Sequence, residues 1–383
     1  MSRADNSAVG RWWWTVDRWT LSCVGLLIGF GYVLMLAASP AVATRIGASR
    51  DMFIFKQVLF LTVAGLIVVS TSMLSVRNVR RLALFGCVAA LGLTALTLVH
   101  GVEIKGARRW IAIPFMSIQP SEFLKPCFAV VTAWLISRSK ESSYFPGRVI
   151  ALMLFLVIVV LLKSQPDIGM LSVVTCVLMA QLFASGLSLV LVGCGVGSMA
   201  GAFVAAYTVF PHVRSRVLRF LHPQQGDHYQ IDTALQAFGH GGLLGRGPGE
   251  GRIKDLLPDA HADFVFAVAG EEFGMVVCLL ITAAFLLIIV RTMIKLIADE
   301  DIFVTLAATG LACGFGLQAF VNMASSLHLI PTKGMTLPFI SYGGSSAMSV
   351  ALTMGMLLAL TRRRASFAHA YPVGATAAAG FRE

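Results

Sequence analysis

The chain has 383 residues, of which 57% are hydrophobic and only 13% are charged, and its mean hydropathy is +0.80. This composition leaves too little polar surface for a water-soluble globular protein, so lipid must be the main solvent of the chain. Lys and Arg outnumber Asp and Glu by 30 to 19, but no basic run interleaved with aromatic residues lies outside the membrane flanks, which argues against a nucleic-acid-binding protein.

Apolar segments recur along nearly the whole chain. About 20 residues of helix cross the hydrocarbon core of a bilayer, and backbone groups in lipid are satisfied inside helices rather than in open sheets. The segments predicted in chain order are 19–38, 54–74, 82–99, 121–137, 149–163, 168–186, 188–210, 264–290, 302–326 and 345–361. The sequence therefore predicts an all-α integral membrane protein with about ten transmembrane helices and both ends on one side.

The distribution of Lys and Arg predicts which side that is. More of them fall on the side that carries the two termini, and cytoplasmic loops retain positive charge during insertion, so both termini are expected in the cytoplasm. We expect a cytoplasmic tail at 1–18, a membrane domain at 19–364 and a disordered cytoplasmic tail at 365–383. A long outer loop, at about 211–263, joins the seventh and eighth helices, and loops of such length are usually functional.

Two polar segments before and at the start of the fourth predicted helix are rich in cations. Arginine forks bind phosphate oxygens through two hydrogen bonds, lysine supplies a point charge, and tryptophan is typical of the headgroup level. The residues concerned, which indicate an anion site, are Lys105, Arg108, Arg109, Trp110, Gln119, Glu122 and Lys125. Two other interpretations stay open: the arginines anchor lipid headgroups, and Glu122 and Lys125, three residues apart on a helix, neutralise each other.

The long loop ends in a glycine-rich stretch followed by His261 and Asp263, where the chain re-enters the membrane. Glycines let the backbone approach a ligand closely. A carboxylate at such a depth is partly desolvated, and desolvation raises the pKa of a carboxyl group and makes it a better general base. We therefore expect Asp263 to be a catalytic base and His261, beside it, to contact the substrate; the alternative is that Asp263 caps the eighth helix.

Three other carboxylates lie at or within the predicted helices. Asp167 follows a proline between the fifth and sixth helices, where it either serves the site or caps the sixth helix. Glu271 and Glu272 lie about two turns inside the eighth helix, and ionisable residues within a span are costly and usually functional. At least one of the two is expected to face the bundle interior, either in a direct role or paired with an arginine.

The last polar segment covers 331–346. Its prolines and glycines exclude a regular helix over most of its length, so we expect a re-entrant loop or a loop that lines the mouth of the bundle. Its candidates for contact with a ligand are Lys333, Ser341, Gly343 and Gly344. The eight histidines of the chain form no recognisable metal motif.

Six motifs occur in order across nearly the whole membrane domain: K-G-A-R-R-W-I, Q-P-S-E-F-L-K, Q-P-D-I-G, P-D-A-H-A-D-F-V-F-A, G-E-E-F-G and I-P-T-K-G-M-T-L-P-F-I-S-Y-G-G-S-S. On these residues the chain resembles the SEDS family of cell-wall polymerases, the group that contains FtsW and RodA. The stretch 331–334 is closer to the division-associated FtsW branch than to the elongation branch. The resemblance implies a multi-pass protein of the bacterial inner membrane that acts at the division site.

The resemblance also implies an activity and partners. It implies a peptidoglycan glycosyltransferase that polymerises lipid II outside the cytoplasmic membrane, together with a class B penicillin-binding protein and other divisome membrane proteins. The catalytic aspartate of the family falls on Asp263, its lysine on Lys125, and the arginine before its tryptophan on Arg109. Two positions depart from the family pattern: Asp259 replaces a glutamate and Ala262 replaces a threonine, so any role that needs the longer carboxylate or the hydroxyl is in doubt.

Glycosyl transfer from a pyrophosphate needs a base for the attacking hydroxyl and cations for the leaving group, and one carboxylate suffices for a single inverting displacement. Asp263 is expected to deprotonate the 4-hydroxyl of the acceptor sugar. The cations expected to hold the donor pyrophosphate are Lys105, Arg108, Arg109, Lys125 and Lys333. A divalent cation, Mg²⁺ or Mn²⁺, could share the charge of the pyrophosphate, although no ligand motif requires one.

Two other functions stay open from the sequence. A lipid II flippase would need a polar path through the bilayer, and most predicted helices carry no charge at mid-depth; Glu271 and Glu272 are the exception. A non-catalytic division scaffold would tolerate substitution of Asp263, but it would not explain the outer cations, which oppose the insertion rule.

Overall fold

The computed structural model describes residues 7–46, 50–104, 107–113, 116–142, 144–209, 211–221, 229–257, 259–331 and 334–362. Within them, each predicted apolar segment forms one α-helix. These helices are α2 (Arg18–Ile46), α3 (Arg50–Ser72), α4 (Val76–His100), α5 (Pro120–Glu141), α6 (Gly147–Ser164), α7 (Ile168–Ala184), α8 (Leu189–Val209), α11 (Val265–Ile297), α12 (Ile302–Ser326) and α13 (Gly344–Leu360). The predicted type and order are confirmed, although α2 and α11 continue well past their predicted ends.

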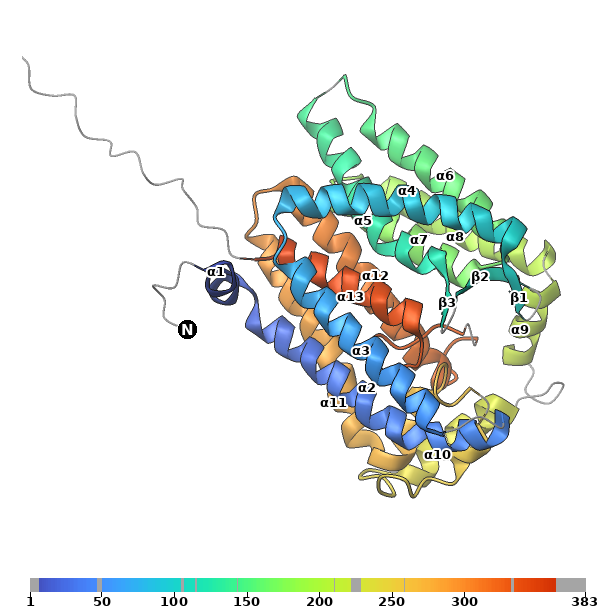
Figure 1. Cartoon of the computed structure of the whole chain (residues 1–383). Helices are drawn as coiled ribbons and strands as arrows, with labels where there is room; N and C mark the ends of the chain where they lie inside the picture. Colours follow the sequence, from blue (N-terminus) through green and yellow to red (C-terminus); the bar gives the residue numbers. More distant parts are fainter. Residues whose placement is uncertain are drawn as a thin grey trace, which may run out of the picture.

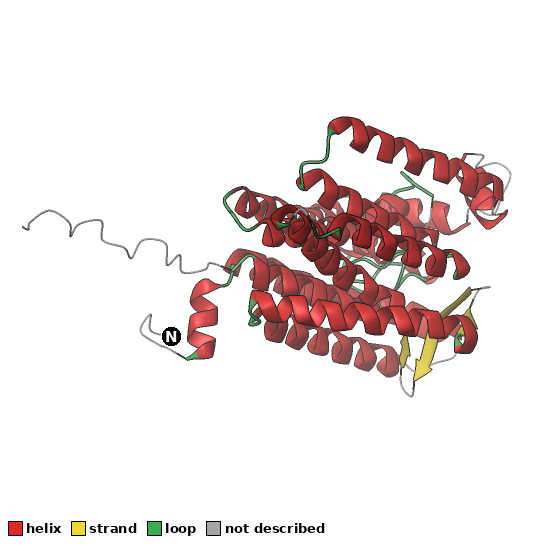
Figure 2. Cartoon of the chain, turned by 90° about the horizontal axis from the view of Figure 1, so that it is seen from above, coloured by secondary structure: helices red, strands yellow, loops and turns green. Residues whose placement is uncertain are grey.

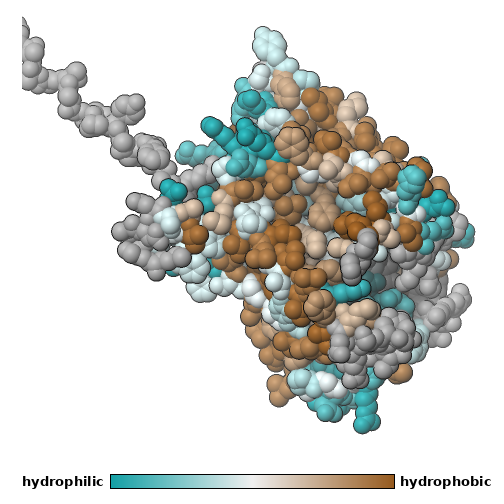
Figure 3. All heavy atoms as spheres, viewed as in Figure 1, coloured by the Kyte–Doolittle hydropathy of each residue, from teal (hydrophilic) through white to brown (hydrophobic). Residues whose placement is uncertain are grey.

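The outer surface of the bundle is apolar enough to face lipid. Among the described residues, six helices are long and apolar enough to cross a membrane, namely α2, α3, α4, α6, α11 and α12, while α7 and α13 are shorter apolar helices. Figure 3 shows hydrophobic residues across the middle of one face and hydrophilic residues toward its margins. Large apolar side chains on the outside of the helices, such as those of Leu66 and Phe85, are mostly exposed. Because water would penalise such a surface, it is a lipid-facing one.

The centre of the bundle is built from α5, α12 and α13. Helix α12 packs against α5, α7, α11 and α13, and α13 packs against α3 and α5; Figure 1 shows these helices running side by side. Small residues let the helices approach closely. A Cβ atom added to Gly310 would lie 2.4 Å from the side chain of Gln181, and one added to Gly355 would lie 2.6 Å from Thr71. Larger residues at these two positions would push the helices apart.

A short helix crosses one end of the bundle. Helix α1 (Ala8–Thr15) runs across the end of α2 and α3 rather than along them, as both views show (Figures 1 and 2). The indole Nε1 of Trp12 donates to the Ser72 hydroxyl at 2.9 Å, which fixes α1 to the last turn of α3. We call this the N-terminal end of the bundle. The opposite end, which carries the segments described next, is called the site end.

A small antiparallel sheet follows α4 at the site end (Figure 2). Its strands are β1 (Val102–Ile104), β2 (Ala107–Ile113) and β3 (Met116–Ile118), in the order β1-β2-β3. The sequence did not predict these strands. Open strand edges are tolerated here because the segment lies between the ends of α4 and α5, where water can reach the backbone.

The predicted outer loop 211–263 is not only loop. It contains the helices α9 (Pro211–Leu221) and α10 (Tyr229–Gly241) and the short 3₁₀ helix η1 (Ile253–Asp255). Helix α10 packs along α11 and η1, where Ala234 and Ala237 are fully buried. The part of the loop from α10 to η1 is therefore packed against the bundle.

Helix α11 is interrupted at Gly274, whose backbone (φ 78°, ψ −179°) is not helical. The break leaves backbone groups on both sides without their helical hydrogen bonds, and the segment 242–247 bonds to them instead. The amides of Arg246 and Gly247 donate to the carbonyls of Glu271 and Glu272 at 3.0 Å each, and the amide of Met275 donates to the Gly242 carbonyl at 3.0 Å. A Cβ atom on Gly274 would lie 2.4 Å from the backbone of this segment, so only glycine fits.

Candidate active site

Two loops at the site end are held together beside Asp263. Asn322 on α12 donates from Nδ2 to the carbonyl oxygens of Asp263, at 3.0 Å, and Met335, at 2.6 Å. Ser341 donates from its hydroxyl to the Ala262 carbonyl at 2.6 Å and accepts the Leu337 amide at 2.7 Å. The bond from Ser341 to Ala262 links the segment 334–343 directly to the turn 259–263, and Asn322 bonds to both. The backbone that carries Asp263 is therefore fixed by α12 and by the segment before α13.

The side chain of Asp263 is half-buried at this junction. Helix α11 begins at Val265, and its N-cap is Phe264 without a side-chain cap, so the interpretation of Asp263 as the cap of this helix is wrong. Gly334 faces the carboxylate: its φ is +62°, and a Cβ atom built there would lie 3.2 Å from Asp263 Oδ2. The predicted cation Lys333 precedes Gly334 but lies outside the described residues, as does Lys105.

Aromatic rings form a wall next to Asp263. The His261 ring lies 5.3 Å from the Tyr342 ring and 5.9 Å from the Phe53 ring, measured between centroids. The Tyr342 amide also donates to the His261 carbonyl at 2.8 Å. Burial lowers the pKa of His261, and the nearby Asp259 only partly opposes that effect. At neutral pH His261 is therefore an uncharged ring that shapes the site rather than a cation that binds phosphate.

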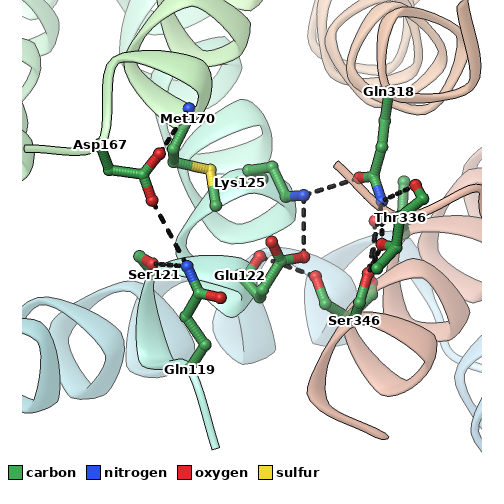
Figure 4. A network of polar contacts seen from close by, with 11 residues as sticks. Gln119, Ser121, Glu122, Lys125, Asp167, Met170, Gln318, Thr336 and Ser346 are labelled. Carbon is green, nitrogen blue, oxygen red and sulfur yellow. Dashed lines mark hydrogen bonds and ion pairs between the residues drawn. The ribbon is translucent and has the colours of Figure 1, made fainter. Parts of the chain in front are cut away.

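A second cluster centres on Lys125 of α5 (Figure 4). The Lys125 ammonium lies 2.9 Å from Glu122 Oε2 and donates to Gln318 Oε1 at 2.6 Å. The side chains of Lys125 and Glu122 are only 9% and 13% exposed. The interpretation that Glu122 and Lys125 neutralise each other is confirmed. The contacts to Glu122 and Gln318 nevertheless fix the position of the Lys125 ammonium.

Gln318 and Asn322 join the two clusters, and the sequence analysis missed both. Gln318 Nε2 donates to the carbonyl and the hydroxyl of Thr336, at 3.1 and 3.2 Å, and to the Ser346 hydroxyl at 3.3 Å. Gln318 and Asn322 are four residues apart on α12, so they lie on one face, one turn from each other. Helix α12 thus connects the Asp263 loop to Lys125. The signal was present: two amides spaced i, i+4 inside an apolar helix.

Arg109 and Asp167 meet at the corner between α6 and α7. Arg109 donates to the carbonyls of Gln165, at 2.9 Å, and Pro166, at 2.6 Å, and lies 3.4 Å from Asp167 Oδ2. Asp167 accepts the Met170 amide at 3.1 Å, so the interpretation of Asp167 as the cap of α7 is confirmed. The same carboxylate accepts from Gln119 Nε2 at 3.4 Å (Figure 4).

Other predicted site residues lie outside these clusters, on β2 or at the start of α13. Arg108 pairs with Glu103 on the neighbouring strand at 3.3 Å, and both side chains are about half exposed. Trp110, also on β2, is half-buried. Gly343 is the N-cap of α13. A Cβ atom on Gly344 would lie 2.9 Å from the Phe60 ring, so Gly344 serves close packing between α3 and α13.

Glu271 and Glu272 are fully buried, and their contacts fix the outer loop rather than form a polar path through the bilayer. Glu271 accepts the backbone amides of residues 252–254 at 2.9 Å each and lies 3.1 Å from His240 Nδ1. Glu272 forms a buried ion pair with Lys254. The expected partner was an arginine; the actual partner is a lysine. Both carboxylates fasten the end of the outer loop to α11.

The described residues contain no group of three or more His, Cys, Asp or Glu side chains placed to hold a metal ion. Within the described ranges, no such group is therefore in place for the Mg²⁺ or Mn²⁺ that could share the charge of the pyrophosphate.

Comparison with known proteins identifies the family. The family model described as "Cell cycle protein", which covers FtsW, RodA and SpoVE, matches residues 18–366. A probable peptidoglycan glycosyltransferase FtsW from Caulobacter vibrioides (strain NA1000 / CB15N) is 41% identical over 365 residues, covering 95% of this chain and 93% of the relative. A protein of the same name from Trichlorobacter lovleyi (strain ATCC BAA-1151 / DSM 17278 / SZ) is 35% identical over 350 residues, covering 88% and 91%.

Solved structures agree with this assignment. The rod shape determining protein RodA of Thermus thermophilus matches with a TM-score of 0.68 and 26% identity, covering 91% of this chain and 97% of RodA. A chain of a peptidoglycan synthase complex matches with a TM-score of 0.75 and 27% identity, covering 90% and 97%. The family model, the relatives and the apolar helices together show that this chain is an integral protein of the bacterial inner membrane and belongs to the FtsW/RodA/SpoVE family.

Proposed function

We propose that the chain is an inverting peptidoglycan glycosyltransferase that polymerises lipid II outside the cytoplasmic membrane during cell division. The relatives named FtsW support the reaction and the division role. The observation that carries the assignment of residues is the connection through α12: Asn322 holds the backbone of Asp263, and Gln318, one turn away, holds Lys125. One helix, α12, thus contacts both the backbone that carries the carboxylate and the side chain of the cation.

In this proposal Asp263 accepts the proton of the acceptor 4-hydroxyl as its oxygen attacks the anomeric carbon of the donor sugar. The bond from that carbon to the pyrophosphate oxygen breaks, and the lipid pyrophosphate leaves. General-base catalysis of this kind contributes about 10²- to 10⁴-fold to a rate. The fixed position of the Asp263 backbone matters because the base must lie within hydrogen-bond reach of the hydroxyl before the reaction starts.

Lys125 is the described cation that we assign to the leaving pyrophosphate. Its ammonium has three N–H groups, and the contacts to Glu122 and Gln318 leave one for a substrate oxygen. Arg109 already directs three nitrogens at the α6–α7 corner, so its main role is to shape that corner. Lys105 and Lys333 stay in the proposal as further cations from segments that border β2 and Gly334.

We place the termini in the cytoplasm and the site end outside, because the Lys and Arg distribution favours that orientation. Lipid II then reaches the site from the outer leaflet. A structural neighbour belongs to a peptidoglycan synthase complex that coordinates polymerization and crosslinking. Because the proposed reaction only polymerises, we propose that a class B penicillin-binding protein supplies crosslinking to this chain within the divisome.

The decisive experiment gives purified protein lipid II in detergent and measures glycan strands by gel electrophoresis. Asp263→Asn should abolish strand synthesis while the protein stays folded, as judged by an unchanged thermal unfolding midpoint. Asp259→Asn, a change of the neighbouring carboxylate, is the matched control and should retain synthesis. Strand synthesis by the Asp263→Asn variant would remove this residue as the base.

The same assay separates the proposal from a flippase or a scaffold, because neither of these proteins forms glycosidic bonds. The structure gives the flippase no particular support. Glu271 and Glu272, the buried carboxylates that favoured a polar path, bind the end of the outer loop and Lys254.

A further inference from the structure

A cavity of about 700 Å³ opens at the N-terminal end of the bundle, opposite the candidate active site. Two segments far apart in the sequence line it: the corner between α1 and α2, and the last turns of α11. The residues are Trp14, Thr15, Val16, Asp17, Arg18, Trp19, Arg291 and Lys295. None of them has a role in the proposed reaction.

The charges of the cavity are unbalanced. Asp17, whose side chain is 3% exposed, accepts Arg291 Nε at 2.7 and 2.9 Å and lies 2.9 Å from Lys295 Nζ. One carboxylate therefore holds two cations, and Arg18 adds a third. Burial raises the pKa of Asp17, but hydrogen bonds from Arg291 and Lys295 lower it by more, to about 2. Asp17 thus stays ionised at neutral pH and keeps both cations in place.

Arg291 is held by Asp17 through only one of its three guanidinium nitrogen atoms. Both contacts from Arg291 to Asp17 use Nε, and its Nη atoms make no hydrogen bond to any residue that the structure describes. The side chains of Arg291 and Lys295 are 38% and 26% exposed toward the cavity mouth. A guanidinium edge with unused N–H groups matches the oxygens of a phosphate.

Tryptophans mark this level of the bundle as a membrane interface. The Arg18 guanidinium lies over the rings of Trp14, at 4.6 Å, and Trp13, at 5.2 Å from the centroids. Trp19 is largely exposed beside them. Tryptophan rings at the start of an apolar span are typical of the headgroup region, and α1 crosses the bundle end as an interfacial helix would (Figures 1 and 2).

We propose that this cavity binds the phosphate of an anionic phospholipid in the leaflet at the N-terminal end, with Arg18, Arg291 and Lys295 as its ligands. Exposed apolar side chains lie on the membrane side of these cations on the two helices that form the cavity: Leu26 on α2, and Leu287 and Val290 on α11. Acyl chains of the bound lipid would lie against them. This apolar continuation favours a lipid over a soluble phosphate compound.

The test titrates purified full-length protein in detergent with phosphatidylglycerol or phosphatidylcholine and counts bound lipids by native mass spectrometry. Phosphatidylglycerol should bind more tightly, since its headgroup carries a net negative charge. Arg291→Gln should weaken its binding about tenfold, because a hydrogen bond between charged groups contributes roughly that much to affinity. Arg18→Gln leaves the ion pairs of Asp17 intact and should also weaken binding, so a folding defect of one variant does not decide the result.

Arg81→Gln is the matched control, because Arg81 is an exposed arginine near the start of α4, at the same end but outside the cavity. Equal binding of the two lipids, equal weakening by Arg81→Gln, or unchanged binding in both cavity variants would overturn the proposal. Inorganic phosphate and pyrophosphate form the soluble arm: displacement of the lipid by either at equal concentration would assign the cavity to a soluble ligand instead. Lipid binding is measured without turnover, so failure of the polymerase proposal leaves this test intact.

Discussion

The two ends of the bundle hold buried charges in different ways. Two of the described cations at the site end each face one carboxylate: Lys125 lies 2.9 Å from Glu122, and Arg109 lies 3.4 Å from Asp167. These pairs are balanced one to one. A balanced pair fixes both side chains but leaves little net field for a ligand.

At the N-terminal end a single carboxylate, Asp17, serves Arg291 and Lys295, while Arg18 lies over indole rings. The net charge of the cavity lining is therefore positive. The comparison shows that an incoming pyrophosphate at the site end has to compete with Glu122 for Lys125, whereas a phosphate at the N-terminal end meets cations in excess. Competition with Glu122 for Lys125 suits a pyrophosphate that must be released after each turnover. An excess of cations suits a lipid that stays bound.

Breaking the balanced pair at the site end should have the largest effect. Lys125→Met removes the proposed pyrophosphate ligand, so strand synthesis should fall by about 100-fold or more. It also leaves Glu122 without its partner, which costs on the order of 3 kcal/mol of stability. The double variant Lys125→Met with Glu122→Gln should recover the thermal midpoint but not the activity. Wild-type synthesis by the double variant would show that Lys125 only neutralises Glu122.

Removing the contacts of Asn322 on α12 should reduce strand synthesis less. It should also distinguish the positioning of Asp263, which affects kcat, from substrate binding, which affects KM. Asn322→Ala removes two hydrogen bonds, each worth about 1 kcal/mol. Because the backbone of Asp263 would shift, kcat should fall by roughly tenfold or more while KM for lipid II stays near its normal value. Ser325→Ala, which removes only a bond within α12, is the control. Equal effects of both substitutions would argue that α12 merely loses stability.

The charge cluster of the N-terminal end predicts a pH dependence. The pKa of Asp17 falls from 3.8 to about 2 on folding, so its contribution, about 2 kcal/mol, is complete above pH 4 and is lost as pH falls toward 2. Asp17→Asn should lower the thermal midpoint at pH 7 and remove that part of the acid sensitivity. Glu141→Gln, in an exposed pair with Arg138, should change neither. An unchanged midpoint in Asp17→Asn would show that the cluster is not stabilising.

The smallest effect is expected for Arg108→Gln. Its pair with Glu103 is half exposed, so stability should change by less than about 1 kcal/mol. Strand synthesis should stay near the wild-type rate, because the contacts of Arg108 lie on the hairpin rather than in either cluster. A tenfold loss in the same assay would extend the site to β2 and restore the role that the sequence indicated.

The helices were predictable because apolar length is a strong and local signal. The sheet was not, since its strands are short and the segment that contains them is basic, which is typical of a loop. That omission also explains why the sequence grouped Arg108 with Arg109 in one anion site. Neighbouring residues on a strand point to opposite faces, so Arg109 reaches the α6–α7 corner while Arg108 turns toward Glu103.

The candidate site was only partly predictable for a similar reason. Asp263 and Lys125 stand in ordered motifs, and Gln318 and Asn322 could have been noticed as amides on one face of an apolar helix. The contacts from Gln318 to Thr336 and Ser346 depend on how the segment before α13 folds back. No local pattern contains that information, because it is set by tertiary packing.

The interruption of α11 at Gly274 has a dynamic consequence. The first turns of α11, which start beside Asp263, end in bonds to 242–247 instead of continuing the helical ladder. The amides of Arg246, Gly247 and Met275 should therefore exchange with deuterium as one cooperative unit, at a rate set by the opening of that seam. A ligand or subunit that binds the segment 242–247 would slow the exchange of all three amides together. It would also reduce the motion of the first turns of α11 and hence of the Asp263 carboxylate beside them.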